Sequence, residues 1–142
     1  MNASQRRSNC PLNVALELFG DKWSLLILRD MLIVGKSRYG EFLDSPEGIS
    51  TNILADRLKQ LACCGLVEKL RDPANGKTSL YLPTAMGVSL LPLLLEVIRW
   101  GLTNLGDTGV PEFVLTALRQ GPDQLIAECE TRLHNERLTL AG

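Results

Sequence analysis

Apolar residues recur at every third or fourth position along the first part of the chain, and this spacing predicts helices. The first helix is expected over 11–19, because proline suits the first helical position and Gly20 interrupts the pattern. A second helix is expected between an Asp21 N-cap and Gly35, and its apolar centre predicts that it is the middle of the domain. A short third helix is expected after its own N-cap, Ser37.

The apolar faces of the first two helices define much of the expected core. The inward face of the first helix is expected to consist of Leu12, Ala15, Leu16 and Phe19. The second helix carries an apolar face at helical spacing, made of Trp23, Leu26, Ile27 and Met31.

The stretch 48–87 changes from helical to alternating periodicity and back again. A fourth helix is expected after Ser50 and before Gly65, with leucines along one face at Leu54, Leu58 and Leu61. The alternating segments on either side of an Asn-Gly turn at 75–76 predict a β-hairpin. A helix, a hairpin and a further helix in this order are typical of a winged helix, so we expect a mainly α fold with a small β-hairpin wing (α+β).

The C-terminal half is expected to be helical throughout. A long helix is predicted from a Thr84 cap to about Leu105, and it is apolar on all sides, so a second subunit is expected to cover part of it. Two shorter helices are predicted over 110–120 and 122–138. The sequence leaves open whether this tail reinforces a dimer or covers an effector pocket. Its helix is expected to pack through Leu125, Ile126, Cys129 and Leu133.

Charge and composition narrow the function only slightly. The 142 residues suffice for one domain, and their net charge is −1. The stretch 1–82 carries 11 Lys and Arg against 9 Asp and Glu, and the stretch 83–142 carries 4 against 7, so the winged-helix part is the more basic. We find no apolar run near the roughly 20 residues of a membrane span and no signal peptide, so a cytoplasmic location is expected.

The sequence offers no constellation typical of catalysis or metal binding. Its four cysteines include the adjacent pair Cys63 and Cys64, and His134 is the single histidine. This spacing is poor for zinc, and in the cytosol the thiols are expected to be reduced. No Ser/His/Asp set and no glycine-rich phosphate loop are found. We therefore expect no cofactor, no metal and no enzymatic activity.

Four segments resemble the HxlR-type transcriptional regulators, which are relatives of the MarR group. In chain order they are CPLNVALELFGDKWSLLILRDML, RYGEFLDSPEGISTNILADRLKQL, GLVEK and YLPTAMGVSLLPLLLEVIRWG. The resemblance covers 10–105 and implies a homodimeric, cytoplasmic DNA-binding protein without enzymatic activity. It also implies that the first helix and the long helix from Thr84 form the dimer, and that a small molecule, an electrophile or an oxidant acts as the signal. The usual family pattern differs at Asn52, at Cys63-Cys64 and after about residue 106.

This resemblance divides the chain into three parts. We expect a flexible N-terminal arm over 1–9, an HxlR-type winged helix-turn-helix domain over 10–105, and a C-terminal helical extension over 106–142.

The candidate base contacts lie on the outward face of the fourth helix. Early residues of a recognition helix read base edges in the major groove, which makes Thr51, Asn52 and Ala55 the candidates, next to the cap Ser50. An Asn side chain can pair with adenine through two hydrogen bonds. Asp56 lies on the same face and would repel phosphate unless it is paired.

Basic residues supply the candidate phosphate contacts. Lys59 and Arg38 are expected near the DNA backbone, whereas Arg57 either contacts phosphate or forms an ion pair that fixes the helix. The wing adds further candidates at and near its tip, namely Arg71, Asn75 and Lys77.

Cys10 is the candidate redox-sensing residue. It directly precedes a helix that begins at Pro11, and the exposed N–H groups there favour a thiolate. The resemblance places the sensing cysteine of redox-responsive members at this position, although a structural thiol at a helix start is the alternative. A disulfide partner would be Cys129 or a thiol of a second subunit.

These observations lead to a leading hypothesis and one alternative. The leading hypothesis is a homodimeric repressor that binds a pseudo-palindromic operator and is released by a small-molecule or redox signal. Three aromatic residues are candidates for an effector pocket or for the core, namely Phe19, Trp23 and Trp100. The alternative is a winged-helix protein–protein interaction module without specific DNA binding, which salt-dependent DNA binding would exclude.

Overall fold

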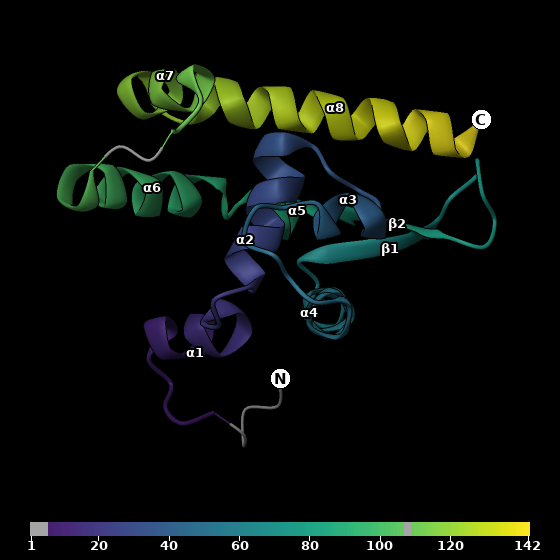
Figure 1. Cartoon of the computed structure of the whole chain (residues 1–142), viewed down its shortest axis with the longest axis horizontal. Helices are drawn as coiled ribbons and strands as arrows, with labels where there is room; N and C mark the ends of the chain where they lie inside the picture. The colour runs from purple at the N-terminus through teal and green to yellow at the C-terminus, as the bar shows by residue number, and fades with distance from the viewer. Residues whose placement is uncertain (1–5, 107–108) are drawn as a thin grey trace.

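A computed structural model describes residues 6–106 and 109–142, so the first five residues of the expected arm lie outside the described part. That part consists of helices and a single two-stranded hairpin, which extends to one side of the molecule (Figure 1). In chain order the elements are α1 (Pro11–Phe19), α2 (Ser24–Arg29), η2 (Asp30–Val34), α3 (Tyr39–Leu43), α4 (Thr51–Cys63), β1 (Val67–Arg71), β2 (Ser79–Pro83), α5 (Ala85–Val88), α6 (Leu91–Leu105), α7 (Glu112–Gln120) and α8 (Asp123–Ala141).

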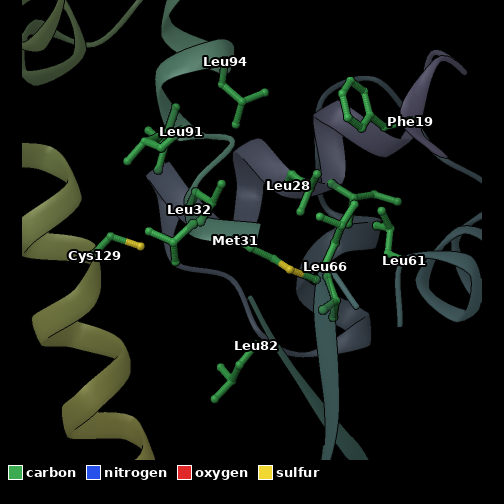
Figure 2. Packing of buried hydrophobic residues seen from close by; sticks show 14 of the residues in the cluster. Phe19, Leu28, Met31, Leu32, Leu61, Leu66, Leu82, Leu91, Leu94 and Cys129 are labelled. Atoms are coloured by element: carbon green, nitrogen blue, oxygen red, sulfur yellow. The ribbon is translucent and has the colours of Figure 1, made fainter. Parts of the chain in front are cut away.

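The second predicted helix is the middle of the domain, as expected. The N-cap position of α2 is Trp23 and not the expected Asp21. The Asp21 carboxylate still accepts hydrogen bonds from the backbone N–H groups of Trp23 and Ser24, each at 3.0 Å, and so satisfies donors at the start of the helix. The helix continues into the π-helical turn η2, which the sequence did not predict, and ends at Gly35 with a φ of 89°. Leu28 and Leu32 are fully buried in this element, at the centre of the packing in Figure 2.

The expected cap of the third helix was wrong by one residue. Arg38 is the N-cap of α3, and its backbone N–H donates to the Glu41 carboxylate at 2.8 Å. Ser37 instead extends the hairpin, because its carbonyl accepts from the Tyr81 N–H at 2.8 Å and Arg38 forms a β-bridge with Leu80. The segment before α3 therefore ties the hairpin to the rest of the domain.

The predicted fourth helix and hairpin are confirmed. The Ser50 hydroxyl accepts from the Ile53 N–H at 3.3 Å at the start of α4, and Gly65 follows its end with a φ of 79°. The antiparallel register of β1 and β2 runs from Val67 opposite Pro83 to Arg71 opposite Ser79. The inward face of α4 is buried as expected, at Leu54, Leu58 and Leu61.

The single long helix predicted after Thr84 is instead two helices. The Thr84 hydroxyl accepts from the Gly87 N–H at 3.2 Å, but this cap begins the four-residue helix α5, which ends at Val88. Pro92 explains the break, because it has no N–H to donate to the Val88 carbonyl and its ring would crowd that carbonyl. Glycine is required at position 87, since an added Cβ would lie 2.2 Å from the Leu66 carbonyl oxygen.

Part of the expected core is exposed in the single chain. Leu12 and Leu16 of α1 are 67% and 46% exposed, which contradicts their predicted burial, whereas Phe19 is buried. Exposed apolar side chains also occur on α5, at Met86, and along one face of α6, at Leu93, Val97 and Trp100. We call the whole set the α1/α6 apolar surface, consisting of Leu12, Leu16, Met86, Leu93, Val97 and Trp100.

One stretch meets the length and composition of a membrane span, which the sequence analysis did not find. It covers Ala85–Leu105, has a mean hydropathy of 1.5 and is 28% buried in the chain. The break between α5 and α6 and the charged residues Glu96 and Arg99 interrupt it. Its exposed apolar side chains belong to the α1/α6 apolar surface.

The C-terminal extension folds onto the domain. Helix α8 runs along the side of the molecule opposite α1 and ends near the hairpin loop (Figure 1). Figure 2 shows Cys129 of α8 directed toward Leu32, and Leu125 and Leu133 are also buried. The Arg132 guanidinium donates to the carbonyl oxygens of Met31 at 2.9 Å and Leu32 at 3.1 Å, so α8 satisfies acceptors at the end of η2.

Candidate nucleic-acid interface

The outward face of α4 is free of core contacts. Thr51, Asn52, Ala55 and Lys59 are all exposed, in the arrangement that the helical spacing predicts. The first turn is held in place from α3, because the Tyr39 hydroxyl donates to the Thr51 carbonyl at 2.6 Å. The helix therefore presents a fixed polar first turn to solvent.

Arg57 forms the ion pair that the sequence analysis considered as one of two alternatives. Its Nε lies 2.9 Å from an Asp21 carboxylate oxygen, and its Nη1 contacts the carboxylate of Asp56. These contacts join α4 to the start of α2. They also pair the charge of Asp56, which would otherwise face a phosphate backbone alone.

Burial raises the pKa of the Asp21 carboxyl, but its hydrogen bonds outweigh that effect. The Ser24 hydroxyl and the N–H groups of Trp23 and Ser24 donate to it, and Arg57 adds a positive charge. The net result is a pKa below the ordinary value of 3.8, so Asp21 is ionised at neutral pH.

Arg38 reaches the loop end of the wing, where β1 passes into the connecting turn. Its Nε lies 3.1 Å from the Asp72 carboxylate, which also accepts from the Ala74 N–H at 2.9 Å and from the Thr78 hydroxyl at 3.3 Å. The hydrogen bond from Arg38, followed by that from Ala74, holds the pKa of Asp72 below 3.8. The Asp72 side chain is buried, while the Arg38 side chain remains 51% exposed beside the wing.

The tip of the wing carries two exposed cations. Lys77 donates its backbone N–H to the Asn75 side-chain oxygen at 3.2 Å, which shapes the turn. The Arg71 guanidinium lies against Gly76, where an added Cβ would come within 2.9 Å of it. Asn75 and Lys77 of the loop and Arg71 at the end of β1 are therefore gathered and exposed at the tip of the wing.

Cys10 is exposed at the start of α1. The backbone N–H groups of Asn13 and Leu12 lower the pKa of its thiol, because they stabilise a thiolate by hydrogen bonding. Nearby Arg7, one of the basic residues of the arm, is paired with Glu17 at 3.2 Å. Cys10 thus has the exposure and the lowered pKa of a reactive thiol.

Two of the other three thiols differ from Cys10. Burial raises the pKa of Cys129 and of Cys64, while Cys63 is exposed on α4. Cys129 belongs to α8, on the side of the molecule opposite α1 (Figure 1). An intrachain disulfide between Cys10 and Cys129 would therefore require α8 to leave the core.

The three aromatic candidates for an effector pocket lie in different surroundings. Phe19 is buried and lines a groove between α1 and α5 of about 390 Å³. Trp23 lines a small cleft beside Phe42 and is covered by the Lys22 ammonium, 5.3 Å from its ring centre. Trp100 is 62% exposed on α6. None of the cavities described here brings the three together.

Sequence reasoning missed a buried charge behind the recognition helix. Asp30 is 4% exposed, lies 2.9 Å from Arg29 and 3.6 Å from Lys36, and accepts a hydrogen bond from the Ser45 hydroxyl. Arg29 also pairs with Glu47 at 2.8 Å. The one signal in the sequence was an acidic residue inside an apolar helix, which requires a partner when buried.

The geometry defines a winged helix-turn-helix. An exposed polar recognition helix lies beside a hairpin with a basic tip, and no group of three or more potential metal ligands is found among the residues that the structure describes. In this class of protein the recognition helix enters the major groove of DNA.

Comparisons with known proteins agree with this class. The profile of the HxlR-like helix-turn-helix family matches residues 18–108. An uncharacterised HTH-type transcriptional regulator of Synechocystis is 35% identical over 92 residues, which cover 65% of this chain and 67% of the relative. The protein belongs to the HxlR-like helix-turn-helix family of transcriptional regulators, which confirms the resemblance read from its sequence.

Two solved structures share the fold. The redox regulator HypR in its oxidised form has a TM-score of 0.60 at 26% identity, covering 71% of this chain and all of its own. The reduced form of the transcriptional regulator YodB from Bacillus subtilis has a TM-score of 0.57 at 30% identity, covering 70% of this chain and all of its own. Redox regulation is therefore found among the relatives of this fold.

Proposed function

We propose that this chain is a cytoplasmic, homodimeric transcriptional repressor without enzymatic activity, which binds a pseudo-palindromic DNA operator. The observation that carries the proposal is the exposed first turn of α4. It presents Thr51, Asn52 and Ala55 together, while Tyr39 and Arg57 fix the helix from behind. A rigid polar helix face of this kind suits base readout in the major groove.

Phosphate contacts would position this helix on the duplex. Lys59 lies on the same exposed face, and the wing adds Arg71 and Lys77 beside Asn75. Arg38 is partly exposed beside the start of the wing's loop. Contacts of this type carry no sequence information but fix the register of a protein on DNA.

The α1/α6 apolar surface supports a dimer. Leu93, Val97 and Trp100 lie at positions i, i+4 and i+7 of α6, so they form one stripe. Large apolar patches on a monomer mark interaction sites. A two-fold dimer built there would present two recognition helices to half-sites about one helical turn apart.

Cys10 is the proposed point of signal input. Its exposure and lowered pKa favour reaction with an oxidant or an electrophile. The relatives include the redox regulator HypR and a YodB structure described as quinone-bound. Modification at the start of α1, beside the α1/α6 apolar surface, would change the spacing of the two recognition helices and weaken operator binding. A reversible ligand at the dimer contact is the alternative signal.

The test is binding to the promoter region upstream of the protein's own gene, measured over a range of salt concentrations. Reduced protein is expected to bind with an affinity that falls steeply with salt. Treatment with a quinone is expected to release the native protein from the promoter DNA, whereas the Cys10→Ser variant should stay bound. Binding that is lost equally in both would remove Cys10 from the mechanism. Absence of salt-sensitive binding to any DNA would favour a protein–protein interaction module.

A further inference from the structure

A groove separates α8 from the loop end of the hairpin, and the proposed function makes no use of it. Its volume is about 870 Å³, within the range of pockets that hold small organic ligands. Helix α8 lies outside residues 18–108, which the family profile matches. The groove is therefore built by the extension of this chain together with the shared domain.

The α8 wall of the groove is a stripe that the core does not use. Leu125, Cys129 and Leu133 pack inward along one face of the helix. A second face, with the same three- and four-residue spacing, lines the groove with polar or small side chains, among them Gln124, Ala127, Glu128, Thr131 and Asn135. This face remains available for a ligand while the helix stays packed.

The opposite wall is formed by the wing and by the segment before α3, and it combines apolar with polar side chains. Pro73 and Ala74 of the turn and Leu80 of β2 contribute its apolar part. Arg38 and Asp72 contribute the polar part, and their side chains are already paired with each other at 3.1 Å. A ligand would therefore meet an apolar surface flanked by a neutralised ion pair.

The groove holds one positive and two negative side chains without a charged partner in the described part of the chain, so the balance of these charges is negative. The positive one is Arg132, which lines the groove and donates to the neutral carbonyls of Met31 and Leu32. The half-buried Glu136 carboxylate has no hydrogen-bond or ion-pair partner among the residues that the structure describes. Glu128 accepts a hydrogen bond from the neutral Gln124 amide at 3.1 Å, which leaves its charge uncompensated.

We propose that this groove binds a small amphipathic cation, that is, a mostly apolar molecule carrying an amine. The apolar part would lie between Leu80 and Ala127, and the ammonium would pair with Glu136. A regulatory consequence follows and rests on the proposed function. Arg38 belongs both to the groove and to the expected DNA-facing surface, so the amine and DNA change each other's affinity.

The test uses three probes of one shape and different charge: 1-naphthylmethylamine, 1-naphthalenemethanol and 1-naphthoic acid. Calorimetric titration of the full chain is expected to show binding of the amine about fivefold or more tighter than the alcohol, and none of the acid. Glu136→Gln is expected to remove the preference for the amine while the alcohol still binds. Equal binding of amine and acid would overturn the proposal.

Two tryptophan variants of α8 locate the site. Thr131→Trp fills the groove and is expected to abolish amine binding, whereas His134→Trp places the same side chain at an exposed position of α8 outside the groove and should leave amine binding intact. Amine binding that persists in Thr131→Trp, with a folded protein by circular dichroism, would contradict the assignment.

Operator affinity measured with and without saturating amine separates the two proposals. We expect a change of about fivefold or more in the native protein and none in Glu136→Gln. Unchanged operator affinity with bound amine would overturn the coupling. If the protein binds the amine but no DNA, only the proposed function is contradicted. If it binds DNA but no amine, only the proposal of an amine site in the groove is contradicted.

Discussion

The Arg57 guanidinium lies 2.9 Å from the Asp21 carboxylate, across 36 residues of sequence. This contact joins the recognition helix α4 to the start of the central helix α2. Asp21 also accepts the N–H groups of Trp23 and Ser24, so one carboxylate serves both helices. The orientation of the recognition helix therefore depends on a charge that never faces the DNA.

Arg57 and Lys59 are expected to respond differently to truncation. Arg57→Ala removes the ion pair and should lower the free energy of unfolding by about 1 kcal/mol. It should also weaken DNA binding but leave unchanged the salt slope, which is the slope of the logarithm of the binding constant against the logarithm of the salt concentration. Lys59→Ala should leave stability unchanged and reduce the salt slope by about one phosphate contact. Urea unfolding and binding titrations at several salt concentrations check both. A reduced salt slope in Arg57→Ala would mean that Arg57 contacts phosphate.

Asp72 is expected to make the wing sensitive to acid. Because its folded-state pKa lies below the ordinary 3.8, its contribution to stability is present above that value and is lost as the pH falls through the lowered pKa. Asp72→Asn should therefore be less stable than the native protein at neutral pH, with the difference shrinking in acid. Urea midpoints compared at neutral pH and near pH 3 test this. The exposed Glu130→Gln is the control, and a difference for Asp72→Asn that persists in acid would refute the account.

Arg132 is expected to anchor the C-terminal extension. Arg132→Met leaves the carbonyls of Met31 and Leu32 without their donor and should cost about 2 kcal/mol in the free energy of unfolding. Arg119→Met removes an exposed ion pair with Glu112 and should have little effect. Equal stability of the two variants would show that the Arg132 hydrogen bonds do not hold α8 on the domain.

The Cys10 thiol is expected to be the most rapidly alkylated cysteine at neutral pH. Its lowered pKa makes more of it thiolate, whereas burial raises the pKa of Cys64 and Cys129. Labelling with iodoacetamide followed by peptide mass spectrometry, repeated over a pH series, gives the rates. The rate at Cys10 should begin to fall only at a pH below the ordinary pKa of a thiol. Faster labelling of Cys63, also exposed, would argue for a different sensor.

The α1/α6 apolar surface is expected to hold the dimer. Val97→Asp places a charge in the middle of the exposed stripe and should yield a monomer in sedimentation velocity experiments. Leu138→Asp changes an equally exposed apolar residue of α8 and should remain dimeric. A dimer that survives Val97→Asp but not Leu138→Asp would move the interface to the extension.

Local signals explain why much of the fold was predictable. The cap at Ser50, the leucine spacing of α4 and the alternation on both sides of Asn75-Gly76 each act within a few residues. The break at Pro92 had a local signal too, but the dense leucines after Thr84 favoured one continuous helix.

The errors arose where the outcome depends on distant residues. Periodicity identifies an apolar face but does not say whether the chain itself covers it, which is why Leu12 and Leu16 were expected in the core. The pairing of Arg38 with Asp72 spans 34 residues, and that of Arg132 with Met31 spans 101. No local pattern specifies such contacts. The long-range contacts that hold the elements around the candidate site in place were therefore seen only in the structure.

The central claim is that α4 reads DNA through its exposed first turn. The most direct test selects bound duplexes from a random DNA pool, with the native protein and with Asn52→Ala in parallel. We expect the reduced native protein to enrich a two-fold symmetric sequence with half-site centres about 10 base pairs apart. It should bind that sequence about a thousandfold or more tighter than unrelated DNA, and Asn52→Ala should lose preference at one base position in each half-site. No enriched sequence, or the same enrichment and affinity with Asn52→Ala, would contradict the proposal that α4 reads DNA through its exposed first turn.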